Sequence, residues 1–280
     1  MSHVAFVVHE GREPAVATAA ALREALEADG VATTLARSPD DVVDEAPDLV
    51  VSVGGDGTFL RGAHVAAASD RPVLGVKVGR LGFLTEVEPG RQALELVRAA
   101  LDGTARVDDR LAALAEAEGG TSFPAQWAMN EVMVEKHARH RLVRLAVHVD
   151  EEYVTTFSAD GVIVATPTGS TAYSFSARGP IVSPTVASLV LTPIAPHMVF
   201  DRSFVLGADQ AVHLEVVGDE PAILSADGRR GFELAIGSRI RIGAAPRSAR
   251  LVIAPEARGF LTRVREKFDL PGDADVGGAG

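Results

Sequence analysis

The spacing of hydrophobic and polar residues divides the chain into two parts. In the first part, short apolar runs alternate with segments that have helical spacing. Short buried strands separated by helices are typical of a parallel sheet that is covered on both faces. The predicted strands are 3–9, 31–37, 48–53 and 73–78, and the predicted helices are 14–30, 58–68 and 91–101.

The second part is rich in strand-like runs. Val143, Leu145, Val147 and Val149 share one face of a predicted strand, because side chains alternate along an extended backbone. Similar runs, with turn residues between them, occur at 161–165, 188–192, 211–217 and 238–242. This alternation predicts a β-rich domain.

The predicted domains follow from these two patterns. An α/β domain is expected over 1–103 and a β-rich domain over 104–256. One further helix is predicted at 261–268, and the spacing leaves open whether 257–270 rejoin the first domain. Residues 271–280 are expected to form a flexible tail.

Composition and charge narrow the classes of protein. The 280 residues include no cysteine, which excludes disulfides and thiolate metal sites and fits a reducing cytoplasm. A formal net charge of -11 disfavours nonspecific binding to nucleic acid. No apolar run reaches the roughly 18 residues of a membrane span, and no secretory signal is recognisable at the N-terminus. We therefore expect a cytoplasmic protein with no nucleic-acid and no membrane partner.

Residues 54–58 read Gly-Gly-Asp-Gly-Thr and lie between an apolar strand and a helix. Glycines let backbone N–H groups approach phosphate oxygens, and a helix N-terminus adds a favourable field. Asp56 is unusual there, because a carboxylate beside phosphates is unfavourable unless it binds a metal or accepts a proton. The loop predicts a phosphate site in which Asp56 has a chemical role and Arg61 faces either phosphates or solvent. The alternative is a plain strand-to-helix turn that Asp56 caps.

Residues 160–174 form a second polar segment. A strand leads into a turn dense in hydroxyl groups and glycine, which suit a sugar and its phosphates, and Tyr173 suits stacking on a ring. Taken alone, the same residues also fit a polar loop between strands. The pair Asn130-Glu131, before an apolar run, is a weaker signal because such pairs commonly lie in turns.

Together these motifs resemble those of the NAD kinase family. VGGDGTFLRGAH resembles the GGDGT motif of that family, which lipid kinases and phosphofructokinases share more loosely. NEVMVEK resembles its Asn-Glu motif, and DGVIVATPTGSTAYSFSARGPIVSP resembles its long signature rich in glycine and threonine. LGVKVGRLGFLTE, LTPIAPHMVFDRSFVL and SADGRR are similar to further family segments, in order along the chain.

The resemblance implies a fold and a reaction. The implied fold is a Rossmann-like α/β domain followed by a β-rich domain that binds NAD. The implied reaction moves the γ-phosphoryl group of ATP to the adenosine 2′-hydroxyl of NAD, with Mg²⁺ or another divalent cation. The family assembles as homodimers or homotetramers. Whether polyphosphate replaces ATP as the donor stays open.

The resemblance also implies which residues form the site. Asp56 matches the catalytic aspartate that contacts and deprotonates the acceptor hydroxyl, and no metal ligand is expected on the chain. The other expected site residues, which face phosphates or contact NAD, are Gly55, Gly57, Thr58, Arg61, Phe83, Asn130, Glu131, Asp160, Thr168, Thr171, Ala172, Tyr173 and Ser176.

Three positions depart from the family pattern. Lys77, Arg178 and Arg229 stand where the family usually has Asn, Gly and Gln. Two alternative functions remain: a GGDGT-type kinase with a lipid or sugar phosphate as acceptor, and a non-catalytic NAD(P)-binding regulator. Asp56 favours an enzyme, because binding alone has no use for that carboxylate.

Overall fold

The computed structural model describes residues 2–42, 46–79, 82–85, 87–229 and 231–271. The chain splits into two compact units, Met1–Asp109 with Ala249–Gly280, and Arg110–Ser248. Unit 1 is an α/β domain with a parallel sheet and unit 2 is an antiparallel β domain, so the predicted fold class is confirmed. Arg80, Leu81, Arg230 and residues 272–280, which belong to the matched segments and the expected tail, lie outside the described residues.

Unit 1 alternates strands and helices as the hydrophobic pattern predicts. Pro14 lies in the first turn of its first helix, where a missing N–H costs nothing, and Gly30 follows the helix at φ 80°. Its elements are β1 (His3–Val8), α1 (Glu13–Ala28), β2 (Ala32–Leu35), η1 (Pro39–Val42), β3 (Leu49–Gly54), α2 (Asp56–Ser69), β4 (Val73–Lys77), α3 (Arg91–Leu101), β5 (Arg106–Arg110), β18 (Ala249–Ile253) and α5 (Phe260–Lys267).

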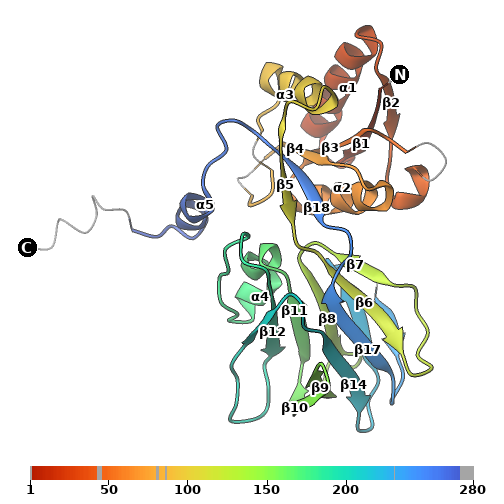
Figure 1. Ribbon diagram of the computed structural model, residues 1–280, viewed down its shortest axis with the longest axis vertical. Helices are drawn as coiled ribbons and strands as arrows, with labels where there is room; N and C mark the ends of the chain where they lie inside the picture. The colour runs from red at the N-terminus through yellow and green to blue at the C-terminus, as the bar shows by residue number, and fades with distance from the viewer. Residues whose placement is uncertain (1, 43–45, 80–81, 86, 230, 272–280) are drawn as a thin grey trace, which may run out of the picture. The chain divides into compact units, whose positions relative to one another are not determined.

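The sheet of unit 1 has the strand order β2-β1-β3-β4-β18-β5, and the strands from β2 to β18 pair in parallel. Helices α1 and α3 cover one face of the sheet and α2 covers the other (Figure 1). Apolar side chains of α1 and α3 pack with one set of alternating strand residues, such as Phe6 and Val51. Since both faces are covered, the central strands are apolar on both sides.

Strands β5 and β18 pair within the sheet of unit 1. The units therefore divide after Asp109 and after Ser248, whereas the sequence pattern suggested boundaries after residues 103 and 256. The sequence RVDDR of β5 is polar, and β18 is separated from its partner β4 by more than half of the chain. Local alternation does not reveal which sheet such strands join.

Helix α5 belongs to unit 1. The guanidinium group of Arg263 donates a hydrogen bond from Nη1 to the carbonyl oxygen of Phe83 at 3.2 Å. The rings of Phe83 and Phe268 lie 5.9 Å apart between centroids. The C-terminal helix therefore returns to the first domain.

Unit 2 consists of two six-stranded sheets whose pairings are antiparallel. Their strand orders are β10-β9-β14-β17-β6-β7 and β13-β12-β11-β8-β15-β16. The elements are β6 (Ala113–Glu118), β7 (Gln126–Ala128), β8 (Glu131–Lys136), β9 (Val143–Val149), β10 (Glu152–Ala159), β11 (Gly161–Ala165), η2 (Thr168–Thr171), α4 (Tyr173–Ser176), β12 (Ser188–Ile194), β13 (Phe204–Gly207), β14 (Val212–Val217), β15 (Ala222–Ala226), β16 (Phe232–Leu234) and β17 (Arg239–Ala244).

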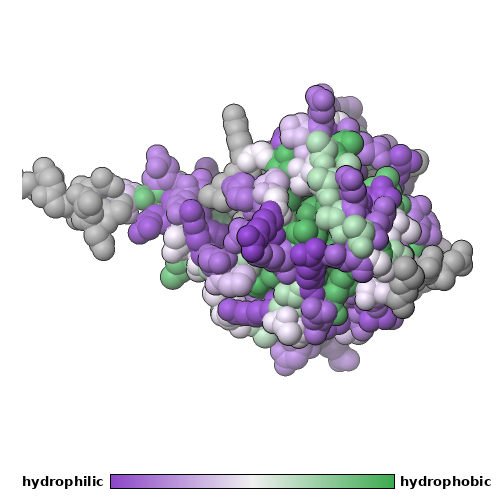
Figure 2. All heavy atoms as spheres, turned by 90° about the horizontal axis from the view of Figure 1, so that it is seen from above, coloured by the Kyte–Doolittle hydropathy of each residue, from purple (hydrophilic) through white to green (hydrophobic). Residues whose placement is uncertain are grey.

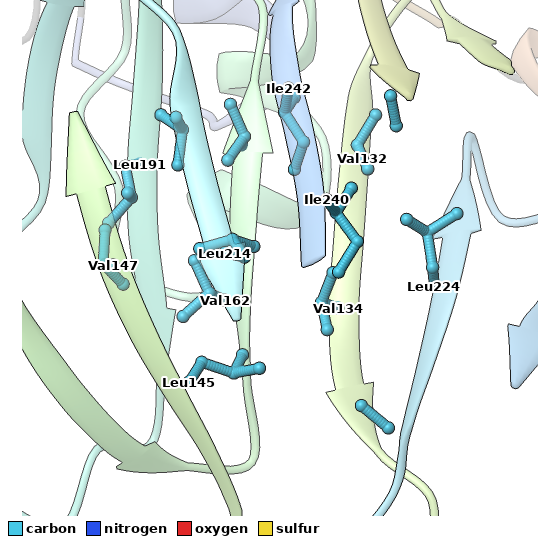
Figure 3. Close-up of a cluster of buried hydrophobic side chains, with 14 of the residues drawn as sticks. Val132, Val134, Leu145, Val147, Val162, Leu191, Leu214, Leu224, Ile240 and Ile242 are labelled. Carbon is cyan, nitrogen blue, oxygen red and sulfur yellow. The ribbon is translucent and has the colours of Figure 1, made fainter. Parts of the chain in front are cut away.

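The core of unit 2 lies between these two sheets. Figure 3 shows side chains from both sheets turned toward one another, among them Leu145 and Leu214 of one sheet and Val162 and Leu191 of the other. The predicted alternation in β9 is confirmed for Val143, Leu145 and Val147, which are fully buried. This core fixes β8 and β11, whose ends carry the polar residues considered below.

None of the described helices is long and apolar enough to cross a membrane. On the face of the molecule seen in Figure 2, hydrophilic side chains predominate and hydrophobic ones lie between them.

Candidate active site

The chain reverses direction across the sheet of unit 1 between β1 and β3. From β1 the chain leads to β2 on one side, and β3 and β4 follow on the other. Loops at the carboxyl ends of two such strands diverge and leave a crevice, which is the usual ligand site of open α/β sheets. Here the two segments are residues 9–12 after β1, and residues 55–58 after β3, where α2 begins at Asp56.

A cavity of about 610 Å³ occupies this crevice. It is lined by the loop after β1, by Gly55 and by the first two turns of α2: His9, Glu10, Gly11, Arg12, Gly55, Asp56, Gly57, Thr58 and Arg61. Of the residues predicted from sequence, the structure therefore brings Gly55, Asp56, Gly57, Thr58 and Arg61 to one cavity. The loop after β1 was missed, although it follows an apolar strand just as the GGDGT loop does.

The floor of the cavity is the N-terminus of α2. Gly55 is the N-cap residue and no described side chain caps the helix, so the first amides of α2 are available to an anion. A Cβ atom on Gly55 or Gly57 would meet nothing within 4 Å, which leaves the backbone open to a ligand. Thr58 is buried, and Gly54 packs directly against its side chain.

Two guanidinium groups add positive charge to this cavity. Arg12 donates from Nη1 to the carbonyl oxygen of Val78 at 3.2 Å, and Arg61 donates from Nη2 to that of Val8 at 3.3 Å. Glu10 also lines the cavity, but its Oε1 lies 2.7 Å from Nε of Arg37. Anchored arginines and open helix amides favour a polyanion such as a chain of phosphates.

Asp56 is held by a segment that lies far from it in sequence. Its two carboxylate oxygens accept the backbone N–H groups of Phe83 at 2.9 Å and Leu84 at 3.1 Å. Gly82 packs so closely that a Cβ atom there would overlap the Asp56 carboxylate. Burial lowers the pKa of Arg263, and the charge of Asp56 opposes that shift, so the guanidinium of α5 also acts on this carboxylate. Phe83 thus contributes through its backbone.

Lys77, one of the departures from the family pattern, lies at the end of β4. Its Nζ is 2.5 Å from Oε1 of Glu88, and its backbone N–H donates to the carbonyl oxygen of Val87 at 2.7 Å. The lysine therefore forms an ion pair at a strand end and does not line the cavity.

The second group of predicted residues lies in unit 2, where β8 begins and β11 ends. Glu131 pairs with Ala165 across the two strands. The N–H of Thr166 donates to the carbonyl oxygen of Asn130 at 2.8 Å, and the Thr166 hydroxyl donates to that of Met129 at 2.6 Å. These bonds join the Asn-Glu motif to the Thr-Gly-Ser-Thr motif.

Gly169 is required at this junction. A Cβ atom at that position would lie 2.0 Å from the carbonyl oxygen of Asn130 and 2.4 Å from its carbonyl carbon. Since these are backbone atoms, a side chain would force the two motifs apart. The glycine of this motif therefore permits a close backbone approach.

The hydroxyl groups of this motif divide into structural and accessible ones. Ser170 donates to the carbonyl oxygen of Pro167 at 2.7 Å and accepts the N–H of Val182 at 2.9 Å, and Ser174 is paired with Thr192. Thr168 is buried and Thr171 and Ala172 are partly buried, whereas Tyr173 is 43% exposed and Ser176 is exposed. The Tyr173 ring is therefore accessible to a partner on which it stacks.

Asp160 lies apart from these residues within unit 2. It precedes β11, whereas Thr168–Thr171 follow that strand, and an extended strand advances about 3.3 Å per residue. Its Oδ1 lies 2.5 Å from Nζ of Lys136. The structure thus brings Asn130, Glu131 and the Thr-rich motif together, and it places Asp160 at the opposite end of β11.

Arg178, the second departure from the family, has a left-handed backbone with φ 67°. A side chain in this region costs about 1–2 kcal/mol, and glycine avoids the clash but adds freedom to the unfolded chain. We expect Arg178→Gly to raise the free energy of unfolding by about 1 kcal/mol, measured by urea denaturation. Arg202→Gly, whose backbone has no positive φ, should give no gain; equal effects of both changes would contradict this account.

Arg229, the third departure, supports the turn before the Asn-Glu motif. Its Nη2 donates to the carbonyl oxygen of Trp127 at 3.0 Å, and its Nε donates to that of Ala226 at 3.3 Å. Beside it, the carboxylate of Asp227 accepts the N–H groups of Met129, Asn130 and Glu131. The segment SADGRR, which contains Asp227, resembles a family segment, but that resemblance did not indicate this function, since Asp227 lies about a hundred residues from the amides that it binds.

Within the described part of the chain, no group of three or more His, Cys, Asp or Glu residues has the arrangement of a metal site. The cavity at the α2 N-terminus, with its arginines and its GGDGT loop, is typical of nucleotide-binding phosphotransferases.

Comparison with known proteins identifies the family. Residues 19–105 match the ATP-NAD kinase N-terminal domain, and residues 129–254 match the ATP-NAD kinase C-terminal domain. The chain belongs to the NAD kinase family, whose members are phosphotransferases. The resemblance drawn from the motifs is confirmed, and a kinase with a lipid or sugar acceptor or a non-catalytic regulator is not favoured.

Relatives match nearly the whole chain. An NAD kinase of Symbiobacterium thermophilum is 41% identical over 96% of this chain and 99% of its own length. NAD kinase 1 of Streptomyces coelicolor is 38% identical over 96% of this chain and 86% of its own.

Solved structures of similar fold include two kinases with bound nucleotides. An NAD kinase from Archaeoglobus fulgidus in complex with ATP is 27% identical with a TM-score of 0.74, over 96% of this chain and 97% of that one. Yeast NADH kinase complexed with NADH has a TM-score of 0.80 over 97% of this chain and 89% of that one. At 24% identity, the second likeness shows the fold alone.

Proposed function

We propose that this chain is an NAD kinase, which transfers the γ-phosphoryl group of ATP to the adenosine 2′-hydroxyl of NAD and so makes NADP. The observation that carries the proposal is Asp56, a carboxylate in the wall of a cavity otherwise suited to phosphates. A site for binding alone has no use for a negative charge there, whereas a transfer to a hydroxyl group needs an acceptor for its proton.

The donor in this proposal is Mg²⁺-ATP, with the cation brought by the nucleotide. Phosphoryl transfer needs an in-line arrangement of donor and acceptor and neutralisation of oxygen charge. The amides of residues 55–57 and the guanidinium groups of Arg12 and Arg61 supply part of that neutralisation from this chain. Inorganic polyphosphate has the same repeating charge and is the alternative donor for the same cavity.

Asp56 orients the acceptor hydroxyl and takes its proton late in the reaction. Carboxylates are weak bases toward a hydroxyl group, so orientation is a large part of its effect. Its two bonds to the amides of Phe83 and Leu84 hold the carboxylate in one position. A fixed group places the acceptor more precisely than a mobile one.

Residues of unit 2 bind NAD in this proposal. Asn130 and Glu131 contact the ribose and base region, Tyr173 stacks on a ring, and Thr168, Thr171, Ala172 and Ser176 complete the contacts. Asp160 lies at the other end of β11, and its contact belongs to a different part of the dinucleotide or to a neighbouring copy. We further propose that the chain forms a homodimer or homotetramer. The absence of cysteine supports the proposed cytoplasmic location.

The dependence on a divalent cation tests the donor assignment. Purified protein with ATP, NAD and Mg²⁺ should form NADP, read by an NADP-specific dehydrogenase. Excess EDTA should abolish the signal, because Mg²⁺ neutralises the triphosphate, and added Mg²⁺ should restore it. Full activity in EDTA would overturn the role proposed for Mg²⁺-ATP.

A further inference from the structure

The Asp227 carboxylate gathers three consecutive backbone amides of the Asn-Glu motif. Oδ2 accepts the N–H of Met129 at 2.8 Å, and Oδ1 accepts those of Asn130 at 2.8 Å and Glu131 at 3.2 Å. The backbone N–H of Asp227 donates to the carbonyl oxygen of Glu131 at 3.0 Å. Hydrogen bonds to an ionised acceptor are roughly twice as strong as neutral ones, so this one side chain fixes the path of the motif.

The turn that carries Asp227 is shaped for this contact. Asp227 follows β15 and has a left-handed backbone with φ 50°. Ala226, the last residue of β15, pairs with Val132 in β8. This pairing brings the carboxylate level with the start of β8, where Asn130 and Glu131 lie. Aspartate tolerates a left-handed backbone better than most residues, because its short side chain bonds to nearby amides.

Glu131 has a partly unsatisfied carboxyl group beside Asp227. Its Oε2 is buried and has no hydrogen-bond partner among the described residues. Burial, and then the charge of Asp227, raises the pKa of Glu131 to about 8, while the N–H of Tyr173 opposes this shift. Burial lowers the pKa of the Arg229 guanidinium, and the charge of Asp227 opposes this shift. Asp227 therefore acts on both the position and the ionisation of Glu131.

We propose that Asp227 is a positioning residue for NAD: its carboxylate fixes the backbone of Asn130 and Glu131, so that both side chains are set for the dinucleotide before it binds. This inference rests on the proposed function. A preset site lowers the ordering cost of binding, and that gain appears in the affinity for NAD and not in the affinity for ATP.

Asp227→Asn tests the proposal in steady-state kinetics. Asparagine keeps the size of the side chain but has one acceptor oxygen in place of two, so at least one buried amide loses its partner. We expect KM for NAD to rise roughly tenfold, while KM for ATP stays unchanged and kcat stays within about threefold. Asp227→Glu should lose the same affinity, because its carboxylate is displaced by one methylene group.

Asp150→Asn is the matched control. Asp150 is a second aspartate of unit 2 with a left-handed backbone, at φ 53°. Its Oδ1 accepts the N–H of Ala211 at 2.9 Å, at a turn between β9 and β10. The control should leave both KM values unchanged. If Asp227→Asn behaves like the control, or weakens NAD and ATP equally, Asp227 is only structural and the proposal is wrong.

The pH dependence of stability supplies a second measurement. Unfolded chains ionise Glu131 near its ordinary pKa of 4.5, whereas the folded protein does so near 8. Between these values the folded state holds a proton that the unfolded state has lost, so this group's contribution to stability falls as pH rises. Glu131→Gln removes that dependence. The difference in melting temperature, Glu131→Gln minus wild type, should therefore be larger at pH 8 than at pH 5.

The same comparison in the Asp227→Asn background isolates the charge of Asp227. Without that charge the pKa of Glu131 falls. The increase in the melting-temperature difference between pH 5 and pH 8 should then be smaller. In the Asp227→Glu background the charge remains and the rise should be kept. An identical pH dependence in all three backgrounds would overturn the electrostatic part of the proposal.

Calorimetric titration of the wild-type protein with NAD separates this inference from the function on which it rests. If the wild type does not bind NAD, the proposed function fails. If the wild type binds NAD and Asp227→Asn binds it equally well, only the positioning role of Asp227 is overturned.

Discussion

Asp56→Asn should lower kcat by roughly 10²–10⁴-fold, the usual contribution of a positioned proton acceptor. Asparagine keeps the shape of the side chain but removes its charge and its ability to take the hydroxyl proton. Binding of NAD should stay within about tenfold of wild type. Steady-state kinetics with NADP formation as the readout, together with calorimetric titration with NAD, measure both quantities.

Asp41→Asn is the control for Asp56. The Asp41 carboxylate also accepts two backbone amides, those of Arg37 at 2.7 Å and Ser38 at 2.8 Å, but it does not line the cavity. This variant should keep kcat within about twofold. Near-normal turnover of Asp56→Asn, or an equal loss in both variants, would contradict a chemical role for Asp56.

Gly169→Ala should raise KM for NAD by roughly 10- to 100-fold, because a small displacement of binding groups has effects of that size. The added methyl group would overlap the backbone of Asn130, so the Asn-Glu motif and the Thr-rich motif must separate. Such overpacking also costs roughly 1–3 kcal/mol of stability. KM values for both substrates and urea denaturation of the variant test the two effects.

Gly259→Ala is a matched glycine change. A Cβ atom at Gly259 would meet nothing within 4 Å, and its backbone, at φ -59° and ψ 152°, suits alanine. This variant should leave both KM values nearly unchanged. If Gly169→Ala is equally harmless, the close approach of the two motifs has no part in NAD binding.

Much of the architecture was predictable from the hydrophobic pattern. The helix predicted at 91–101 is α3, and the strand predicted at 161–165 is β11, each with the expected bounds. Apolar periodicity is a local property, and buried elements retain it because each must present one face or both to a core. The assignment of β5 and β18 to a sheet was not predictable, because pairing between distant strands leaves no local signal.

The candidate site was predictable where motifs are contiguous. Residues 55–58 are consecutive at the N-terminus of α2, so their shared cavity follows from the motif itself. Asp160 and Thr168 also belong to one motif, yet a strand separates them and they lie at its opposite ends. Asp227 was missed because its contacts with the Asn-Glu motif depend on the register of β15 on β8. A sequence pattern shows neither how far apart a strand places the two ends of a motif nor how two distant strands pair.

The transfer of a labelled phosphoryl group tests the central claim most directly. The purified chain is incubated with Mg²⁺ and ATP labelled with ³²P at the γ position, in the presence of NAD, and the products are separated. NAD kinase activity predicts that the label appears in NADP, and that a phosphatase specific for the 2′-phosphate releases it. Label in another acceptor, or none transferred to NAD by the folded protein, would contradict the proposed function.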